Sequence, residues 1–319
     1  MKAIRIHEFG PPEVMRLEEV PDLQLVKPDQ VIVQVKAVGI NPVDTYIRSG
    51  NYAIKKELPF TPGMDSAGIL LQVGSQVKTF RPGQRVYTSG SLSGAYAQQA
   101  LCLAERVHPL PDNISFEQGA ALGVPYGTAW RGLFQRGRAV AGQWVLIHGA
   151  SGGVGIAAVQ IAAAAGMQVI ATAGSEEGRA LAKEQGARHV FDHNDPEHMK
   201  KIFDLTRGVH VILEMLANVN LDLDLDILAK GGRVVVIGSR GRIEIDPRKT
   251  MSRELDICGL MLMNATPQET KEIYSGIEKG LKEGKLNPII DKRLPLESAP
   301  QAHHEIINAC HRGKIILLP

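Results

Sequence analysis

The sequence is poor in cysteine, in aromatic residues and in net charge. Its 319 residues include three cysteines, Cys102, Cys258 and Cys310, whose wide separation excludes a disulfide scaffold and is typical of a reducing compartment. The 36 basic residues nearly balance the 34 acidic ones, and 5% of the chain is aromatic, so the composition does not favour a nucleic-acid partner. No apolar run approaches the roughly 20 residues of a membrane span, and the N-terminus lacks a signal-peptide core. We therefore expect a cytoplasmic protein without membrane segments.

Histidine and cysteine also lack the spacing of a metal site. The 10 histidines form no spaced cluster beyond His303 and His304. Those two are neighbours in a predicted helix, so they cannot face one ion from the same side, and we expect a solvated or packing pair. The sequence predicts a metal-free protein.

The chain length and the change in pattern along it predict two domains. The first part is β-rich and irregular, with short strands separated by Pro and Gly turns, and it is typical of a rolled β-domain. Its predicted strands cover residues 31–38, 67–73, 85–88 and 95–100. A capping box at Ser115 to Gln118 predicts a short helix over 119–122, and a longer helix is predicted over 127–134.

Strands and helices then alternate, as expected for a parallel sheet covered on both faces. Predicted strands cover 144–147, 168–173, 189–191, 209–215, 233–238 and 257–263, and predicted helices cover 176–185, 196–205 and 220–228. Thr266, Pro267 and Glu269 predict a capped helix to near residue 284. The tail adds 294–296, a helix from about 298, and 314–318. The predicted fold class is α/β: a Rossmann-type doubly wound parallel sheet over 119–263, with a β-rich domain over 1–118 to which 264–319 return.

The apolar strand at 144–147 runs into a glycine-rich turn and then directly into a helix of small residues. Gly152, Gly153 and Gly155 leave room for a phosphate to approach the free N–H groups at the helix N-terminus. Ala150 stands where the G-x-G-x-x-G pattern has its first glycine. The order strand, turn, helix predicts a dinucleotide site, and a structural loop is the alternative.

No carboxylate stands at the end of the second strand of this unit, where NAD-binding folds place an acidic residue for the ribose hydroxyls. Gly174, Ser175 and Arg179 instead leave space and donors for a 2′-phosphate, which favours NADPH over NADH. Ser175 is equally suited to be a helix N-cap, with Glu176 and Glu177 in the first turn. Those glutamates oppose a phosphate if they turn inward.

Six separated motifs resemble one family along nearly the whole chain: NPVDTYIRSGNY, TPGMDSAG, HGASGGVG, TAGSEEG, EMLANVNL and GGRVVVIGSRGRIEIDPR. They are similar to the zeta-crystallin type of NADPH:quinone oxidoreductase, in the medium-chain dehydrogenase/reductase superfamily. The resemblance implies a GroES-like catalytic domain, NADPH as cofactor and hydride transfer to a quinone. The zinc-ligand positions of alcohol dehydrogenases in that superfamily match Asn41, Met64 and approximately Ala120, none of which is a zinc ligand, so zinc-independent chemistry is expected.

The resemblance also implies the site residues. It places Asn41, Tyr46 and Tyr52 near the nicotinamide and substrate, at the mouth between the domains. Asn41 could donate its amide to a carbonyl oxygen, and Tyr46 could orient cofactor hydroxyls or supply a proton. The alternatives are a turn residue for Asn41 and an aromatic packing residue for Tyr52.

Cofactor contacts implied by the family pattern fall on Tyr46, Ser151, Gly152, Gly153, Val154, Gly174, His193, Asn220, Gly238, Ser239 and Arg240. Lys314 is a further phosphate candidate, with an exposed, solvated lysine as its alternative. Asn220 could equally be a plain helix N-cap, and His193 a lone loop histidine.

Two other functions stay open at this point. The same zinc-free scaffold could reduce alkenals or enones, and the chain could be an NADPH-binding protein with a structural or RNA-binding role. The apolar run 257–263 at a sheet edge is a pairing template, so we expect a homodimer, with a tetramer as a further possibility.

Overall fold

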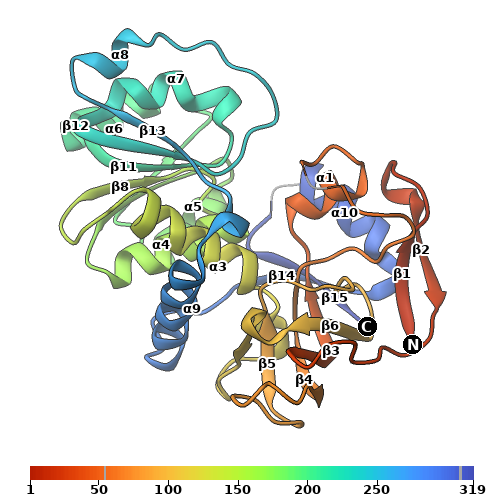
Figure 1. Cartoon of the computed structure of the whole chain (residues 1–319). Helices are drawn as coiled ribbons and strands as arrows, with labels where there is room; N and C mark the ends of the chain where they lie inside the picture. Colours follow the sequence, from red (N-terminus) through yellow and green to blue (C-terminus); the bar gives the residue numbers. More distant parts are fainter. Residues whose placement is uncertain (54, 309–310) are drawn as a thin grey trace. The chain divides into compact units, whose positions relative to one another are not determined.

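The computed structural model describes residues 1–53, 55–308 and 311–319, which fold into two compact units (Figure 1). Unit 1 comprises Met1–Val124 and Asn287–Pro319, and unit 2 comprises Pro125–Leu286. Cys310 lies outside the described residues, whereas Cys102 and Cys258 are free thiols. None of the helices in the described part of the chain combines the length and apolarity that a membrane crossing requires.

Unit 2 is built on a parallel sheet of six described strands in the order β10-β9-β8-β11-β12-β13. The strands are β8 (Trp144–Ile147), β9 (Gln168–Ala173), β10 (His189–Asp192), β11 (Val209–Glu214), β12 (Leu228–Val236) and β13 (Asp256–Gly259). In chain order this is 3-2-1-4-5-6, the usual order of dinucleotide-binding folds. The predicted Rossmann-type sheet is confirmed, and β13 is its edge strand.

Helices cover both faces of this sheet because its central strands are apolar on both sides. The helices are α3 (Gly123–Trp130), continued by a π-helical segment (Arg131–Arg136), α4 (Gly153–Ala164), α5 (Glu176–Glu184), α6 (His198–Thr206), α7 (Ala217–Ile227), α8 (Arg248–Met251), a 3₁₀ turn (Leu262–Asn264) and α9 (Pro267–Lys282). Figure 1 shows α6 and α7 on one face and α4 on the other. Leu146, Ile212 and Val234 are fully buried between these layers.

Residues 264–286 group with unit 2, which differs from the predicted return to the first domain at residue 264. The reason is that α9 packs on α3 and its π-helical continuation. Gly276 lies so close to Trp130 that an added Cβ would come within 2.0 Å of the indole ring, and Arg131 pairs with Glu269 at 3.0 Å. The chain returns to unit 1 only at Asn287.

The described residues of unit 1 form a seven-stranded sheet and a separate hairpin of β1 and β2. Its strands are β1 (Lys2–Ile6), β2 (Met15–Glu19), β3 (Gln30–Gly39), β4 (Asp65–Val73), β5 (Arg85–Thr88), β6 (Gln99–Leu103), β7 (Val107–Pro109), β14 (Ile290–Pro295) and β15 (Lys314–Leu318). Its helices are α1 (Pro42–Arg48), α2 (Phe116–Gly119), α10 (Ala299–Asn308) and 3₁₀ turns at Pro12–Val14, Ala104–Arg106 and Leu296–Ser298. Strand β3 pairs with β4, β6 and β15, so the C-terminal tail completes the first domain.

The local signals that the sequence offers are mostly correct. Ser115 caps α2 and Thr266 caps α9, each in the predicted capping box. The predicted strand 95–100 is wrong in its bounds, because only Ala97 bridges to Ala3 before β6 begins at Gln99. The predicted strand 257–263 ends at Gly259, since the chain turns into a 3₁₀ helix at Leu262.

Candidate active site

The turn between β8 and α4 forms an open cradle of backbone N–H groups. Helix α4 has Gly152 as its N-cap and no side chain that caps its first turn. An added Cβ on Gly155 would lie 2.3 Å from Gly149 O, so the turn packs tightly against the helix there. An added Cβ on Gly152 would meet nothing closer than Gly149 O at 3.6 Å, so that side is open. Free N–H groups beside open space at a helix N-terminus suit a phosphate, and Ser151, Gly153 and Val154 belong to this turn.

Four of the predicted residues meet at the carboxyl ends of β9 and β10. An added Cβ on Gly174 would lie 2.5 Å from His193 Nε2, so the histidine covers this glycine. Ser175 is the N-cap of α5, and its Oγ accepts the Gly178 N–H at 3.1 Å, which confirms the capping alternative. Arg179 Nη1 pairs with Asp192 Oδ2 at 2.8 Å.

Asp192 is a feature that the sequence pattern does not single out. It ends β10, and a backbone hydrogen bond from Asn194 is the main reason that its pKa is lowered, with Arg179 contributing. The guanidinium of Arg179 is therefore held by a carboxylate from the neighbouring strand rather than free.

The segment after β12 lies on the turn between β11 and α7. Gly238 approaches so closely that an added Cβ would lie 2.3 Å from Met215 O, and its carbonyl accepts the Ala217 N–H at 2.9 Å. The Arg240 N–H donates to Asn218 Oδ1 at 2.8 Å, and Ser239 donates to Gly241 O at 3.1 Å. The predicted Gly238, Ser239 and Arg240 thus lie against the start of α7 at the carboxyl ends of the strands.

Asn220 is not a helix N-cap, so that alternative is wrong. Helix α7 begins at Ala217, which places Asn220 one turn inside it. Its Nδ2 donates to Glu214 Oε1 at 3.3 Å. The amide is therefore oriented by a buried carboxyl group at the end of β11.

In unit 1, Lys314 and Asn41 form an internal ion-pair network with Asp65. Lys314 is 3% exposed, and its Nζ donates to Asn41 Oδ1 and lies 3.7 Å from Asp65 Oδ2. Asn41 Nδ2 donates to Asp65 Oδ2 at 2.9 Å. Burial lowers the pKa of Lys314 and raises that of Asp65.

This network bears on the predictions for two residues. Lys314 is neither an exposed lysine nor a free phosphate ligand, because its ammonium neutralises Asp65. Asn41 is the N-cap of α1; its Oδ1 accepts from Lys314 and one hydrogen of its Nδ2 is donated to Asp65, so the side chain is held in this buried network, and its role toward a substrate carbonyl stays a prediction.

A chain of buried hydrogen bonds holds α1 in unit 1. Arg48 Nη1 donates to His303 Nδ1 at 3.0 Å, so the proton of this neutral imidazole is on Nε2, which lies 2.9 Å from Tyr96 Oη. Tyr96 in turn donates to Asp44 Oδ2 at 3.2 Å. Burial lowers the pKa of His303 to about 3. Of the predicted histidine pair, His303 is therefore a buried structural residue, while His304 is exposed and contacts Glu13 at 2.6 Å.

Tyr46 lies on α1, and Tyr52 follows that helix. Both are half-buried. Within the described residues the Tyr46 hydroxyl has no hydrogen-bond partner, which leaves it available to a ligand. Burial raises the pKa of the Tyr52 phenol. Their catalytic roles stay predictions.

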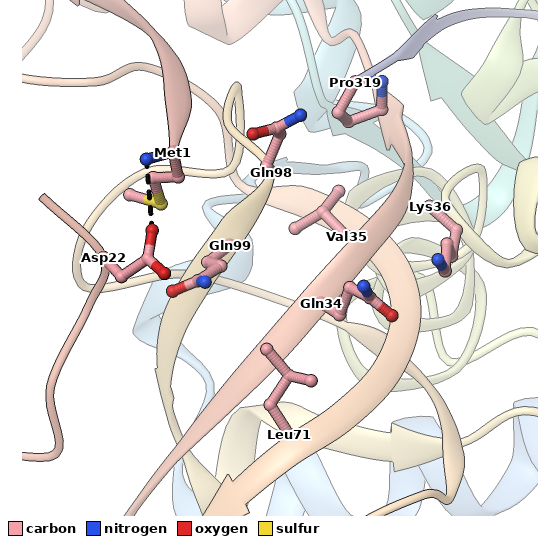
Figure 2. A pocket seen from close by; sticks show the side chains of 9 residues that line it. All are labelled: Met1, Asp22, Gln34, Val35, Lys36, Leu71, Gln98, Gln99 and Pro319. Atoms are coloured by element: carbon pink, nitrogen blue, oxygen red, sulfur yellow. Dashed lines mark ion pairs between the residues drawn. The ribbon is translucent and has the colours of Figure 1, made fainter. Parts of the chain in front are cut away.

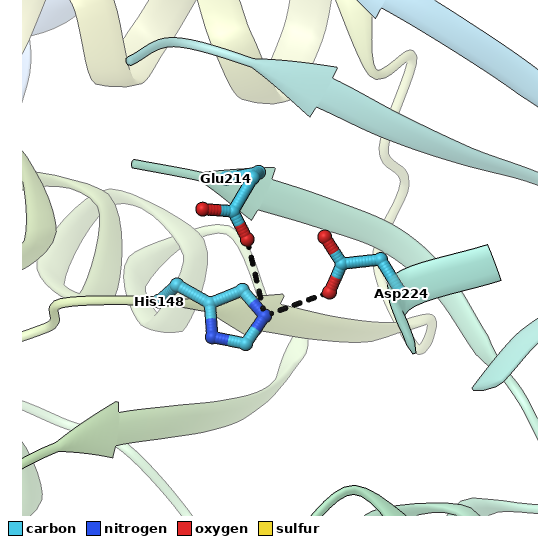
Figure 3. Close-up of side chains that lie close together, drawn as sticks. All are labelled: His148, Glu214 and Asp224. Atoms are coloured by element: carbon cyan, nitrogen blue, oxygen red, sulfur yellow. Dashed lines mark hydrogen bonds and ion pairs between the residues drawn. The ribbon is translucent and has the colours of Figure 1, made fainter. Parts of the chain in front are cut away.

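A second buried cluster lies directly beneath the glycine turn of unit 2. His148, Glu214 and Asp224 bring one donor atom each to within 4.8 Å of one another (Figure 3). Sequence patterns do not reveal this cluster, because its members are separated by up to 76 residues. The one available signal is that His148 directly precedes the glycine turn.

A cavity on unit 1 lies away from all of these groups (Figure 2). It is lined by Met1, Asp22, Gln34, Val35, Lys36, Leu71, Gln98, Gln99 and Pro319. No predicted site residue lines it, and an ion pair between the Met1 amino group and Asp22 at 3.1 Å occupies one side. It is a surface hollow beside the first and last described residues.

The comparisons with known proteins agree with this arrangement. Residues 27–112 match the alcohol dehydrogenase GroES-like domain, and residues 153–278 match a family described as zinc-binding dehydrogenase. Quinone oxidoreductase from Mus musculus is 49% identical over 323 residues, covering 100% of this chain and 98% of that protein, and the Homo sapiens protein is 46% identical over 321 residues with the same coverage. The chain belongs to the quinone oxidoreductase family. The resemblance seen in the sequence motifs is thereby confirmed.

Solved structures of this family have the same fold. The quinone oxidoreductase of Escherichia coli in complex with NADPH has a TM-score of 0.90 at 29% identity, and each chain is covered completely. The quinone oxidoreductase of Pseudomonas syringae pv. Tomato DC3000 has a TM-score of 0.91 at 30% identity, covering 100% of this chain and 99% of that one.

The residues of unit 1 do not fit the zinc ion that the description of one matching family implies. Asn41 is committed to Asp65 and Lys314, and Met64 and Ala120 offer no zinc ligand. Within residues 1–53, 55–308 and 311–319, the cluster of Figure 3 is the one group of three acidic, histidine or cysteine side chains close enough to share an ion, and it lies in unit 2.

Proposed function

We propose that this family member transfers hydride from NADPH to a quinone without a metal ion. The observation that supports the proposal best is the open cradle at Gly152, where uncapped N–H groups face free space at the N-terminus of α4. The Escherichia coli relative was solved with NADPH, and the mouse and human relatives carry the quinone oxidoreductase name. A quinone accepts hydride readily because the charge is delocalised onto its conjugated oxygens, so a Lewis acid is not required.

In this proposal the bound NADPH supplies the hydride, and the chain supplies binding and orientation. The cradle of residues 151–154 holds the pyrophosphate, while Gly174, Ser175, Arg179 and His193 receive the adenosine end. Gly238, Ser239 and Arg240, which lie against the β11–α7 turn, and Asn220 in α7 approach the cofactor from the second half of the sheet. Tyr46, whose hydroxyl is unpartnered within the described residues, orients cofactor hydroxyls or donates a proton to the reduced quinone oxygen.

The proposed activity is tested by following NADPH oxidation with an ortho-quinone and, in parallel, with an α,β-unsaturated ketone. We expect turnover of the quinone, retained after exhaustive treatment with a chelator. Faster turnover of the unsaturated ketone would make the chain an enone reductase instead. Tight NADPH binding without turnover of either acceptor would favour a structural role.

Tyr46→Phe tests the catalytic use of the hydroxyl. General acid catalysis by one side chain contributes about 10²- to 10⁴-fold, so kcat should fall by about 10²-fold or more with a quinone at saturating NADPH. Tyr52→Phe is measured beside it, because it removes the other phenol that is predicted at the site. Unchanged kcat and KM in Tyr46→Phe would remove Tyr46 from the mechanism.

Arg179→Ala tests the proposed 2′-phosphate contact. Loss of one charge-assisted contact of about 1.5 to 3 kcal/mol should raise the Kd of NADPH by about ten- to a hundredfold and leave that of NADH nearly unchanged. Arg188→Ala, at an exposed arginine outside the proposed site, provides a control. An unaltered NADPH/NADH preference would show that the Asp192 pair leaves Arg179 no role in cofactor choice.

We propose a homodimer formed through the edge strand β13. Ile257 on this strand is 42% exposed, and an apolar edge strand is a template for pairing with a second copy. Ile257→Lys should convert the dimer to a monomer in light scattering at micromolar concentration. A wild-type chain that is already monomeric would contradict this arrangement, and a larger particle would indicate the tetramer.

We also propose a cytoplasmic location. The thiols of Cys102 and Cys258 are free rather than paired, which is the usage of a reducing compartment.

A further inference from the structure

The buried cluster of His148, Glu214 and Asp224 contains two carboxyl groups and no lysine or arginine partner among the described residues. Glu214 and Asp224 are both 0% exposed, and His148 is 3% exposed. Burying two ionised carboxylates without a cation costs roughly several kcal/mol per ion, which is comparable to the stability of a whole domain, so the cluster is expected to hold a proton.

The hydrogen bonds of His148 indicate that this proton is not on its imidazole ring. His148 Nε2 lies 2.9 Å from Asp224 Oδ1 and 3.5 Å from Glu214 Oε2, and Nδ1 lies 3.0 Å from the Thr172 hydroxyl (Figure 3). Burial lowers the pKa of this imidazole, which keeps it neutral. A neutral ring with its hydrogen on Nε2 donates to Asp224 and accepts from Thr172, so every ring nitrogen is satisfied without an added proton.

The two oxygens of Glu214 have different surroundings. Oε1 accepts from the Leu216 N–H and from Asn220 Nδ2, so it behaves as a carbonyl oxygen. Oε2 faces His148 and Asp224, and it is buried with no hydrogen-bond partner among the described residues, as is Asp224 Oδ2. A hydrogen on Oε2 that is donated to the Asp224 carboxylate gives this orphaned oxygen a partner.

We infer that Glu214 is held as a neutral carboxylic acid whose Oε2 hydrogen bonds to Asp224, and that in this state it positions Asn220 and the β11–α7 turn for the cofactor. Glu214 contacts this turn through its side chain and through its backbone. Its side chain holds Leu216 and Asn220, and its backbone carbonyl accepts the N–H groups of Ile237 and Gly238 at 2.9 and 3.2 Å. The inference rests on the proposed NADPH function, and Glu214 acts in it as a positioning residue.

The charges around Glu214 agree with this assignment. Burial raises the pKa of both carboxyl groups to about 7, and their mutual interaction raises that of Glu214 while it lowers that of Asp224. The other titratable groups facing the cluster are His148 at the end of β8 and, through it, His193 after β10. Strand β9 contributes the uncharged Thr172, and β12 pairs Val236 with Glu214.

The inference predicts that NADPH binds best when Glu214 is protonated. Because affinity is lost as the pH rises through a free-protein pKa of about 7, the Kd of the wild type should rise about tenfold between pH 6 and pH 8. Glu214→Gln, whose amide donates to Asp224 and accepts from Leu216 and Asn220 at every pH, should abolish this difference. The 2′-phosphate of NADPH titrates near pH 6 in both proteins and cancels in the comparison.

The experiment measures NADPH Kd by fluorescence titration from pH 6 to pH 9. Asp226→Asn, at an exposed position of the same helix, should keep the wild-type profile. Parallel profiles for the wild type and Glu214→Gln would overturn the inference. No NADPH binding by the wild type at any pH would instead contradict the proposed function.

Infrared spectroscopy of the protein without cofactor decides the protonation state independently. We expect a carboxylic acid C=O band at pH 6 that is missing in Glu214→Gln and that fades above pH 7 in the wild type. Absence of such a band overturns the assignment. A stoichiometric divalent metal in the purified wild type, lost in Glu214→Gln, would overturn it as well by showing that a cation rather than a proton neutralises the cluster.

Discussion

Gly152→Ala is expected to fold as the wild type does and to bind NADPH at least about tenfold more weakly. Gly152 has φ −83° and ψ 174°, which alanine adopts freely, and an added Cβ meets no protein atom closer than 3.6 Å. The methyl group would therefore occupy only the open side of the cradle, where the proposed pyrophosphate approaches the N–H groups. A loss of about 1.4 kcal/mol in binding corresponds to the tenfold change.

Gly155→Ala is the informative contrast. There an added Cβ would lie 2.3 Å from Gly149 O and 2.6 Å from Ala150 Cα, so the strain falls on the protein itself. We expect a lower thermal midpoint for Gly155→Ala and an unchanged one for Gly152→Ala in calorimetry, with Kd values from fluorescence titration. Wild-type NADPH affinity in Gly152→Ala would show that phosphates do not bind at this turn.

The elements of this fold could be predicted where their signals are local. Strand β8 is a short apolar run followed by a glycine turn, and β15 is an apolar run after Gly313, so both bounds follow from adjacent residues. The capping box of Thr266 and Glu269 predicts where helix α9 begins. The sequence does not predict that α9 belongs to unit 2, because the contact between Gly276 and Trp130 joins residues far apart in the chain.

For the candidate site too, local features could be predicted from the sequence and long-range contacts could not. The glycine turn and the missing carboxylate at Gly174 can be seen in the sequence, since each lies within one strand–turn–helix segment. The roles of Asn41 and Lys314 could not be predicted, because their contact spans 273 residues. A lysine in an apolar strand can form a buried ion pair or extend into solvent, and the sequence around it does not distinguish the two. The cluster of His148, Glu214 and Asp224 could not be predicted for the same reason, because its members are separated by up to 76 residues.

Lys314→Met should strongly destabilise unit 1. It removes the ammonium that faces Asp65 and leaves a 0% exposed carboxylate without its cation, which costs about 3 to 5 kcal/mol. Hydrogen exchange measured by mass spectrometry resolves the two units, and amides of β3, β15 and α1 should exchange about a hundredfold or more faster. Amides of the unit 2 sheet should exchange at the wild-type rate. Lys249→Met is the control, because it breaks surface ion pairs with Asp222 and Asp226 at 2.7 and 2.8 Å that are worth less than about 1 kcal/mol each.

The pH dependence of the Lys314→Met defect separates a lost ion pair from lost packing. Burial already raises the pKa of Asp65 and Lys314 lowers it, so the substitution raises the folded-state pKa further above the unfolded value. A carboxyl group with a raised folded pKa destabilises the protein as the pH increases, so the defect should shrink at acid pH, where Asp65 is neutral. Adding Asp65→Asn should restore part of the stability and remove this pH dependence. A defect that is equally large from pH 5 to pH 8, and that Asp65→Asn does not relieve, would mean that the aliphatic stem of Lys314, and not its charge, holds β15 against β3.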